Sequence, residues 1–166
     1  MLDTDRLYLR EQTIHDLDRL YEIYSSENIT KYMEGLYEDY EEEYNFTLAY
    51  IKNMYNFYGY GIWLVVRKED DEIIGRAGLS NREVDGEIKL ELGYVIADEY
   101  QNYGYAYEAC KAICRFVKEF LYEEEIVCFI RKENISSIKL AEKLGFKYLM
   151  NVMHEEKEYI YYMKKI

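Results

Sequence analysis

Between residues 87 and 146 the spacing of apolar side chains changes its period several times. Residues 90–96 alternate as a strand does, whereas residues 106–120 repeat at helical spacing. A short apolar stretch at 126–130 is typical of a second strand. Residues 134–146 then have a polar start, an apolar helical face and a glycine stop. The order strand, turn, helix, strand, helix predicts a sheet with crossover helices packed against it.

The first strand-to-helix junction, residues 101–106, reads Gln-Asn-Tyr-Gly-Tyr-Ala. The first N–H groups of a helix have no partner within it, and the helix dipole adds partial positive charge, so such a junction suits a phosphate. Gly104 lets the backbone come close to an anion, and Ala106 has a very small side chain. A tight turn that needs glycine only for its geometry explains the same residues. The junction alone leaves both interpretations open.

Two motifs together resemble the GNAT superfamily of N-acetyltransferases. The coenzyme loop of that family has the pattern Gln/Arg-x-x-Gly-x-Gly/Ala, which Gln101, Gly104 and Ala106 match. A later element of the family places an asparagine before a helix that ends in Leu-Gly-Phe, as Asn134 and residues 144–146 do. The two motifs also have the separation that the family has.

The N-terminal part narrows the resemblance. Residues 4–10, Asp16 and residues 29–33 are similar to the ribosomal-protein N-terminal acetyltransferase branch. The resemblance covers essentially the full chain. We therefore expect a single α/β (α+β) domain over residues 1–166, with helices on both faces of a mixed, mostly antiparallel sheet of six to seven strands. The expected order is strand, two helices, three strands, helix, strand, helix and two strands.

Local patterns position the remaining elements. Thr13 can cap a helix that runs to Tyr24, with Asp16 at the capping-box position. Asp85 and Gly86 indicate a hairpin turn. Further strands are expected at residues 7–10, 61–67, 73–79 and 88–96, a helix at 41–55, and a closing hairpin at 148–154 and 158–163. The last strand is rich in tyrosine and could pair with a second subunit to form a homodimer.

The charge of the chain restricts its partners. A net charge of −12 makes nucleic acid an improbable partner, because phosphate contacts require a basic surface. Such a field would attract a cationic amine acceptor, or it would only keep the protein soluble. The acidic run at residues 38–43 belongs either to an acceptor pocket, as the resemblance suggests, or to the solvated start of a helix.

Cysteine usage and hydropathy give further expectations. Cys110, Cys114 and Cys128 fit no metal-ligand spacing, so we predict small buried apolar residues and no metal site. The chain has no apolar run as long as a membrane span and begins with acidic residues, so we expect no membrane contact and a cytoplasmic location.

The resemblance implies acetyl transfer to an amine, which requires that the amine lose its proton. An alkylammonium has a pKa near ~10, and a carboxylate, or a water molecule held by one, could accept that proton. Glu91 is the candidate general base, because it lies near the middle of the strand before the coenzyme loop, at a position where the branch that this chain resembles often has its acid. By strand parity it shares a face with Gly93, which leaves space beside the carboxylate. The alternative is a strand residue that faces solvent.

A proton donor could help the thiolate to depart. Because a thiol has a pKa near ~8.5, the thiolate could also leave without one. Many family members place a tyrosine seven residues after the motif asparagine, but Ala141 occupies that position. A tyrosine elsewhere could take the role. Ser137 is the candidate acid by resemblance to the ribosomal-type branch, and it could equally be an ordinary residue of a helix start.

The resemblance also implies a binding path for the acetyl-CoA co-substrate. The pantetheine arm would contact Asn134 and the backbone of one strand, and the pyrophosphate would rest on the turn. The complete candidate set is Val95, Ile96, Gln101, Asn102, Tyr103, Gly104, Tyr105, Ala106 and Asn134. The predicted activity is acetyl transfer to a protein N-terminus or a small amine. The alternatives are a polyamine acetyltransferase and a non-catalytic acyl-CoA-binding module.

Overall fold

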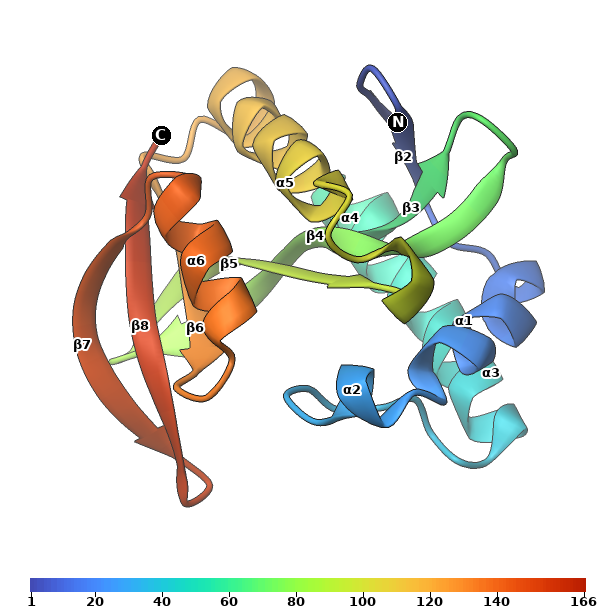
Figure 1. The fold of residues 1–166 in the computed structure, drawn as a ribbon, viewed down its shortest axis with the longest axis horizontal. Helices are drawn as coiled ribbons and strands as arrows, with labels where there is room; N and C mark the ends of the chain where they lie inside the picture. Colours follow the sequence, from blue (N-terminus) through green and yellow to red (C-terminus); the bar gives the residue numbers. More distant parts are fainter.

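The computed structural model describes residues 1–166 and contains one eight-stranded sheet in the order β1-β2-β3-β4-β5-β6-β8-β7 (Figure 1). All neighbouring strands are antiparallel except β5 and β6. The strands are β1 Leu2–Asp3, β2 Leu7–Arg10, β3 Ile62–Arg67, β4 Glu72–Val84, β5 Glu87–Ile96, β6 Glu125–Arg131, β7 Lys147–His154 and β8 Lys157–Lys165. The predicted fold class is confirmed. The sheet has one strand more than the six to seven expected, because β1 pairs with β2 at the edge.

The helices follow the predicted order, with two short additions, α2 and α4. They are α1 Leu17–Tyr24, α2 Glu27–Thr30, α3 Tyr40–Tyr50, α4 Asn56–Tyr58, α5 Tyr105–Phe116 and α6 Ile135–Lys143. The capping box at Thr13 and Asp16 is present, although the first turn is a 3-10 helix. Helix α2 was not expected, because four residues are too few to produce a helical period. No helix has both the length and the apolar character needed to span a membrane.

Strand β3 has buried side chains on both of its faces, so helices cover both faces of the sheet. Its side chains alternate between two clusters of buried residues. Trp63 and Val65 belong to the main core with α5, where the Trp63 ring meets the edge of Phe116 at 5.4 Å between centroids. Leu64 and Val66 pack instead against Leu20 of α1 on the opposite face. The central strands are therefore buried on both sides.

The one parallel pair of strands separates almost at once. Strands β5 and β6 are registered only at Glu91 and Val127. Residues 92–96 of β5 continue to pair with β4 on one edge but have no strand on the other. Helices α5 and α6 cover the same face of the sheet (Figure 1). Both contribute to the main core, to which Leu92 of β5 and Cys128 of β6 also belong. A gap therefore opens in the sheet beneath these helices.

The tyrosine-rich strand lies inside the sheet and not at its edge. Strand β8 pairs with β6 on one side and β7 on the other, which leaves β7 as the edge strand. Because both edges of β8 already carry hydrogen bonds, the predicted pairing of this strand with a second subunit is wrong.

Two glycines that face each other across β4 and β5 differ in the space around them. A Cβ on Gly78 would lie 2.0 Å from the carbonyl oxygen of Gly61, whereas a Cβ on Gly93 would meet no atom within 4 Å. We expect Gly78→Ala to lower the free energy of unfolding by about 2 kcal/mol through overpacking. Gly93→Ala should change it by less than about 0.5 kcal/mol. Urea denaturation measures both, and equal effects would contradict this account of the packing.

Candidate active site

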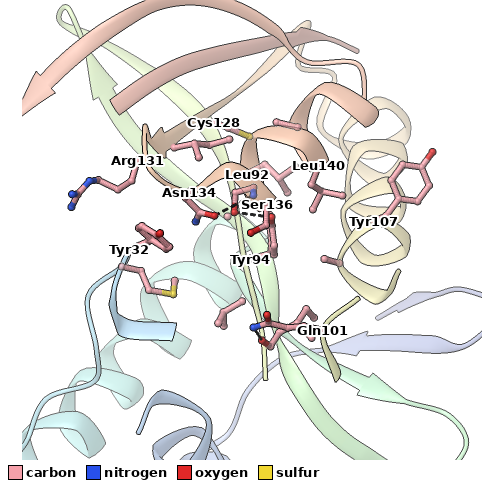
Figure 2. A pocket seen from close by; sticks show the side chains of 18 of the residues that line it. Tyr32, Leu92, Tyr94, Gln101, Tyr107, Cys128, Arg131, Asn134, Ser136 and Leu140 are labelled. Carbon is pink, nitrogen blue, oxygen red and sulfur yellow. Dashed lines mark hydrogen bonds between the residues drawn. The ribbon is translucent and has the colours of Figure 1, made fainter. Parts of the chain in front are cut away.

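A cavity of about 760 Å³ occupies the gap between β5 and β6 (Figure 2). It is lined by the second half of β5, the turn before α5, the end of β6 and the start of α6. Figure 2 places Tyr32 and Arg131 on one side of the cavity and Tyr107 on the other, with Gln101 near the turn. Of the predicted site residues, all but Tyr103 line this cavity. The acidic residues of the 38–43 run do not.

The turn before α5 presents a row of free backbone donors. Asn102 has a φ of 66° and Gly104 a φ of 84°, so the chain turns sharply through the left-handed region before the helix begins. The N–H groups of residues 102–107 make no hydrogen bond within the protein. The first bond of the helix is that from the Glu108 N–H to the Gly104 carbonyl, at 3.1 Å. The turn can therefore bind an anion through its backbone.

Side chains hold this turn from both ends. The Gln101 amide donates to the Ile96 carbonyl at 2.9 Å and to Asp98 at 3.0 Å, so its side chain makes structural bonds within the protein. At the other end Arg6 donates to the Tyr103 carbonyl at 3.0 Å and pairs with Glu108 at 2.7 Å. The free donors are thus fixed before any ligand arrives.

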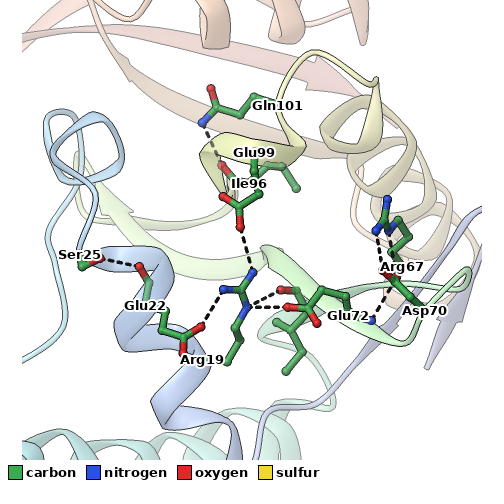
Figure 3. A network of polar contacts seen from close by, with 10 residues as sticks. Arg19, Glu22, Ser25, Arg67, Asp70, Glu72, Ile96, Glu99 and Gln101 are labelled. Carbon is green, nitrogen blue, oxygen red and sulfur yellow. Dashed lines mark hydrogen bonds and ion pairs between the residues drawn. The ribbon is translucent and has the colours of Figure 1, made fainter.

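The segment between β5 and the turn is also tied to helix α1. Figure 3 shows Arg19 reaching Glu22, Glu72 and Glu99. The corresponding ion pairs measure 2.8, 2.9 and 3.2 Å. Because Glu99 belongs to the short 3-10 turn Asp98–Tyr100, Arg19 links α1 and β4 to the entrance of the anion-binding turn.

Asn134 caps helix α6 and keeps part of its side chain free. Its Oδ1 accepts the Ser137 N–H at 3.2 Å, while its Nδ2 has no partner in the protein. The Tyr94 hydroxyl of β5 donates to the Ser137 hydroxyl at 2.9 Å across the gap. Burial raises the pKa of Tyr94, and the bond to Ser137 opposes that shift. Ala141 lies beneath and is buried.

Glu91 lies where β5 and β6 separate. It points to the face opposite the main core, as its parity with Gly93 predicted, and its side chain is 17 % exposed. Arg82 of β4 donates to both of its carboxylate oxygens, at 3.4 and 3.2 Å. Burial raises the pKa of Glu91, and the charge and hydrogen bonds of Arg82 oppose that shift. A carboxylate of raised pKa is a better proton acceptor when it is ionised.

The three cysteines are buried and unpaired. Burial raises the pKa of the Cys110, Cys114 and Cys128 thiols, so all three are protonated and poor nucleophiles at neutral pH. Cys128 lines the cavity. The structure contains no group of three or more His, Cys, Asp or Glu residues that could hold a metal ion.

Two residues of this site were missed by the sequence analysis. The hairpin turn at Asp85 and Gly86 sets the register that places Arg82 diagonally across from Glu91, so the sequence contained a signal for it. Tyr94 was not among the predicted site residues. Its bond to Ser137 depends on how far α6 lies from β5, which no local pattern encodes.

The gap beside the parallel strand pair, the turn with free N–H groups and the helix-capping Asn134 fit an acyl-group transferase, and the comparisons with known proteins agree. The model of the acetyltransferase (GNAT) domain matches residues 6–147. This chain therefore belongs to the GNAT acetyltransferase family, as its two motifs indicated.

Individual relatives agree with this assignment. The uncharacterised N-acetyltransferase YnaD of Bacillus subtilis is 29% identical over 147 residues, which is 88% of this chain and 82% of that protein. The ribosomal-protein-S5-alanine acetyltransferase of Vibrio fischeri has a similar structure, with a TM-score of 0.83, 16% identity and coverage of 98% of this chain and 94% of that one. The spermidine N-acetyltransferase of Vibrio cholerae, in complex with CoA and spermine, superposes with a TM-score of 0.79 at 20% identity and covers 98% of this chain and 96% of that one. At these identities the two structures establish the fold alone.

Burial and Arg82 have opposite effects on the pKa of Glu91, and an experiment can separate them. We expect Arg82→Met to raise the pKa of Glu91 further, because it removes the positive charge and leaves the burial. Carbon-13 NMR of labelled glutamate carboxyls measures the titration, with Glu91→Gln to assign the signal. Lys132→Met is the control, since Lys132 pairs with Glu158 and does not line the cavity. A Glu91 pKa unchanged by Arg82→Met would contradict the pairing.

Proposed function

We propose that this protein transfers an acetyl group from acetyl-CoA to a primary amine by direct attack. The observation that carries the proposal is a single cavity, in the gap between β5 and β6, that joins the free N–H groups of the 102–107 turn to the Glu91 carboxylate. A phosphate-bearing thioester and an amine could meet there from opposite faces of the sheet.

The residues present suit coenzyme A. The N–H groups of residues 102–106 would hold the pyrophosphate, with Gly104 allowing a close approach. The free Nδ2 of Asn134 would donate to a carbonyl of the pantetheine arm. The edge of β5 at Val95 and Ile96, which has no strand beside it, would add backbone hydrogen bonds, as when a peptide extends a sheet, while the Ile96 carbonyl also accepts from Gln101. Acetyl-CoA supplies an activated acyl group with a good leaving thiolate.

Glu91 would accept the proton that the amine loses, directly or through a water molecule. The raised pKa strengthens it as a base, and the ion pair with Arg82 opposes that rise. Ser137 would stand near the departing sulfur, and the bond from Tyr94 orients its hydroxyl. This pair offers a proton donor in place of the tyrosine that Ala141 replaces. The high thiol pKa values of the three cysteines support direct transfer without an acetylated enzyme.

Binding of the co-substrate is the first test. A ligand at a hundred times its Kd stabilises the native state by about 2.7 kcal/mol, so acetyl-CoA and CoA should raise the melting temperature while ATP should not. Gly104→Glu should abolish the shift, because its carboxylate would meet the pyrophosphate. Gly104→Ala is the matched control, since it introduces the same left-handed strain without the charge. No shift at millimolar acetyl-CoA in the native protein would refute the proposal.

The role of Glu91 is tested by turnover. We expect Glu91→Gln to lower kcat by about a hundredfold while Kd for acetyl-CoA stays unchanged, since general bases contribute on this order. In the native enzyme the rate should fall as the pH drops through the raised pKa of Glu91, because the protonated acid cannot accept a proton. A native rate and pH profile in Glu91→Gln would rule Glu91 out. Coenzyme binding without turnover of any amine would favour the non-catalytic module.

A further inference from the structure

The cavity carries a charge opposite to that of the chain. The protein has a net charge of −12, yet the charged residues that line the cavity are four cations and one carboxylate. Lys143 lies over the Tyr107 ring, on the side of the anion-binding turn. The coenzyme phosphates would lie at the turn. The other three cations of the cavity, Lys31, Arg82 and Arg131, are therefore available to a different anionic group.

Arg82 and Arg131 flank one face of the diverging strands. Phe129 and Arg131 alternate with the core residues of β6, so they point to the face opposite α5 and α6, as Glu91 does. The Arg82 guanidinium lies 4.1 Å from the centroid of the Phe129 ring. Arg131 is four residues beyond Val127, the partner of Glu91, which is about 13 Å along the strand. The two cations thus bracket the position from which an amine would approach Glu91.

Arg131 has unused hydrogen-bonding capacity. Its Nε is buried without a partner, and its guanidinium makes no hydrogen bond in the protein. Its one ion pair is with Glu133 at 3.3 Å, and the Glu133 side chain is 56% exposed. The Tyr32 hydroxyl donates to the Glu133 carbonyl at 3.2 Å and closes this side of the cavity (Figure 2). A bound carboxylate could take the place of the exposed Glu133 carboxylate with better geometry.

The other two cations are also incompletely paired. Arg82 uses only Nη1 for Glu91, so its Nη2 and Nε have no hydrogen-bond partner. Lys31 forms no ion pair and lies 5.1 Å above the Tyr32 ring. The N–H groups of Arg82 and Arg131 that lack a hydrogen-bond partner would be satisfied by an anionic ligand.

On the basis of the proposed function, we propose that the acceptor is a primary amine that also carries an acidic group, which Arg131 and Arg82 bind while Glu91 receives the amine. The class includes peptides with an acidic residue next to the N-terminal amine. A polyamine would place additional positive charge beside three cations.

The overall acidity of the protein does not oppose this proposal. Exposed charges are screened over about 8 Å at physiological ionic strength, so the net charge governs the approach of a ligand more than its contacts. The acidic run at residues 38–43 lies outside the cavity, where Asp39 caps α3. Close contacts therefore decide the preference, and these contacts are cationic.

The test compares acceptors that differ in one group. Ala-Glu-Ala-amide and Ala-Gln-Ala-amide have almost the same shape, and Ala-Lys-Ala-amide and spermidine represent cationic acceptors. We expect kcat/KM for the Glu peptide to exceed that for the Gln peptide by about tenfold or more, as charged hydrogen bonds contribute on this scale. The preference should shrink as salt is added. An equal or higher rate with the Gln peptide, the Lys peptide or spermidine would overturn the proposal.

Substitution of Arg131 links the preference to this side chain. Arg131→Gln should reduce the Glu-to-Gln preference severalfold while Kd for acetyl-CoA is unchanged. Lys132→Gln is the matched control from the same strand end, since Lys132 pairs with Glu158 outside the cavity, and it should keep the native preference. Melting temperatures of both variants check folding, and the peptide comparison in the native enzyme does not depend on either.

The outcomes separate this inference from the proposed function. If no amine is acetylated although acetyl-CoA binds, the proposed activity fails. If amines are acetylated but the acidic peptide has no advantage, the activity stands and the acceptor class is wrong. A native preference retained in Arg131→Gln would also overturn the role of Arg131.

Discussion

The structure depends on the early separation of β5 and β6. The two strands share one register pair, Glu91 with Val127, and then diverge. Residues 92–96 therefore have no strand beside them on this edge, and the gap gives the cavity access to both faces of the sheet. Helices α5 and α6 keep the gap from closing, because each begins at its margin and packs into the same core.

Charge is distributed in two opposed patterns on this framework. The surface is strongly acidic, whereas cations predominate in the cavity. Glu91 is the one carboxylate among the cations of the cavity. Burial raises its pKa, and Arg82 limits that rise through an ion pair of 3.2 Å. The same arginine thus tunes the proposed base and takes part in the proposed acceptor site. A substitution at Arg82 would change both the pKa of Glu91 and the acceptor site, whereas a substitution at Arg131 tests the acceptor site alone.

Much of the site followed from short-range patterns. The turn at Gly104, the Asn134 cap and the parity of Glu91 with Gly93 each depend on a few consecutive residues, and each lies where the sequence predicted. The tyrosine-rich strand lies where the sequence predicted, but its pairing with a second subunit was wrong, because composition does not reveal that β8 is inserted between β6 and β7. The Tyr94 and Ser137 contact was missed for a similar reason, since it joins a strand to a helix 43 residues later.

The sequence by itself determined the order of the elements, the glycine turn before α5 and the family, because these depend on periodicity, glycine geometry and two local motifs. Tertiary structure alone decided which charges meet. Arg82, Glu91 and Arg131 come from three strands, and their distances depend on register and on the angle at which β5 and β6 separate. Electrostatic interactions fall off with distance and depend on burial, so the character of the cavity could not be read from a net charge of −12.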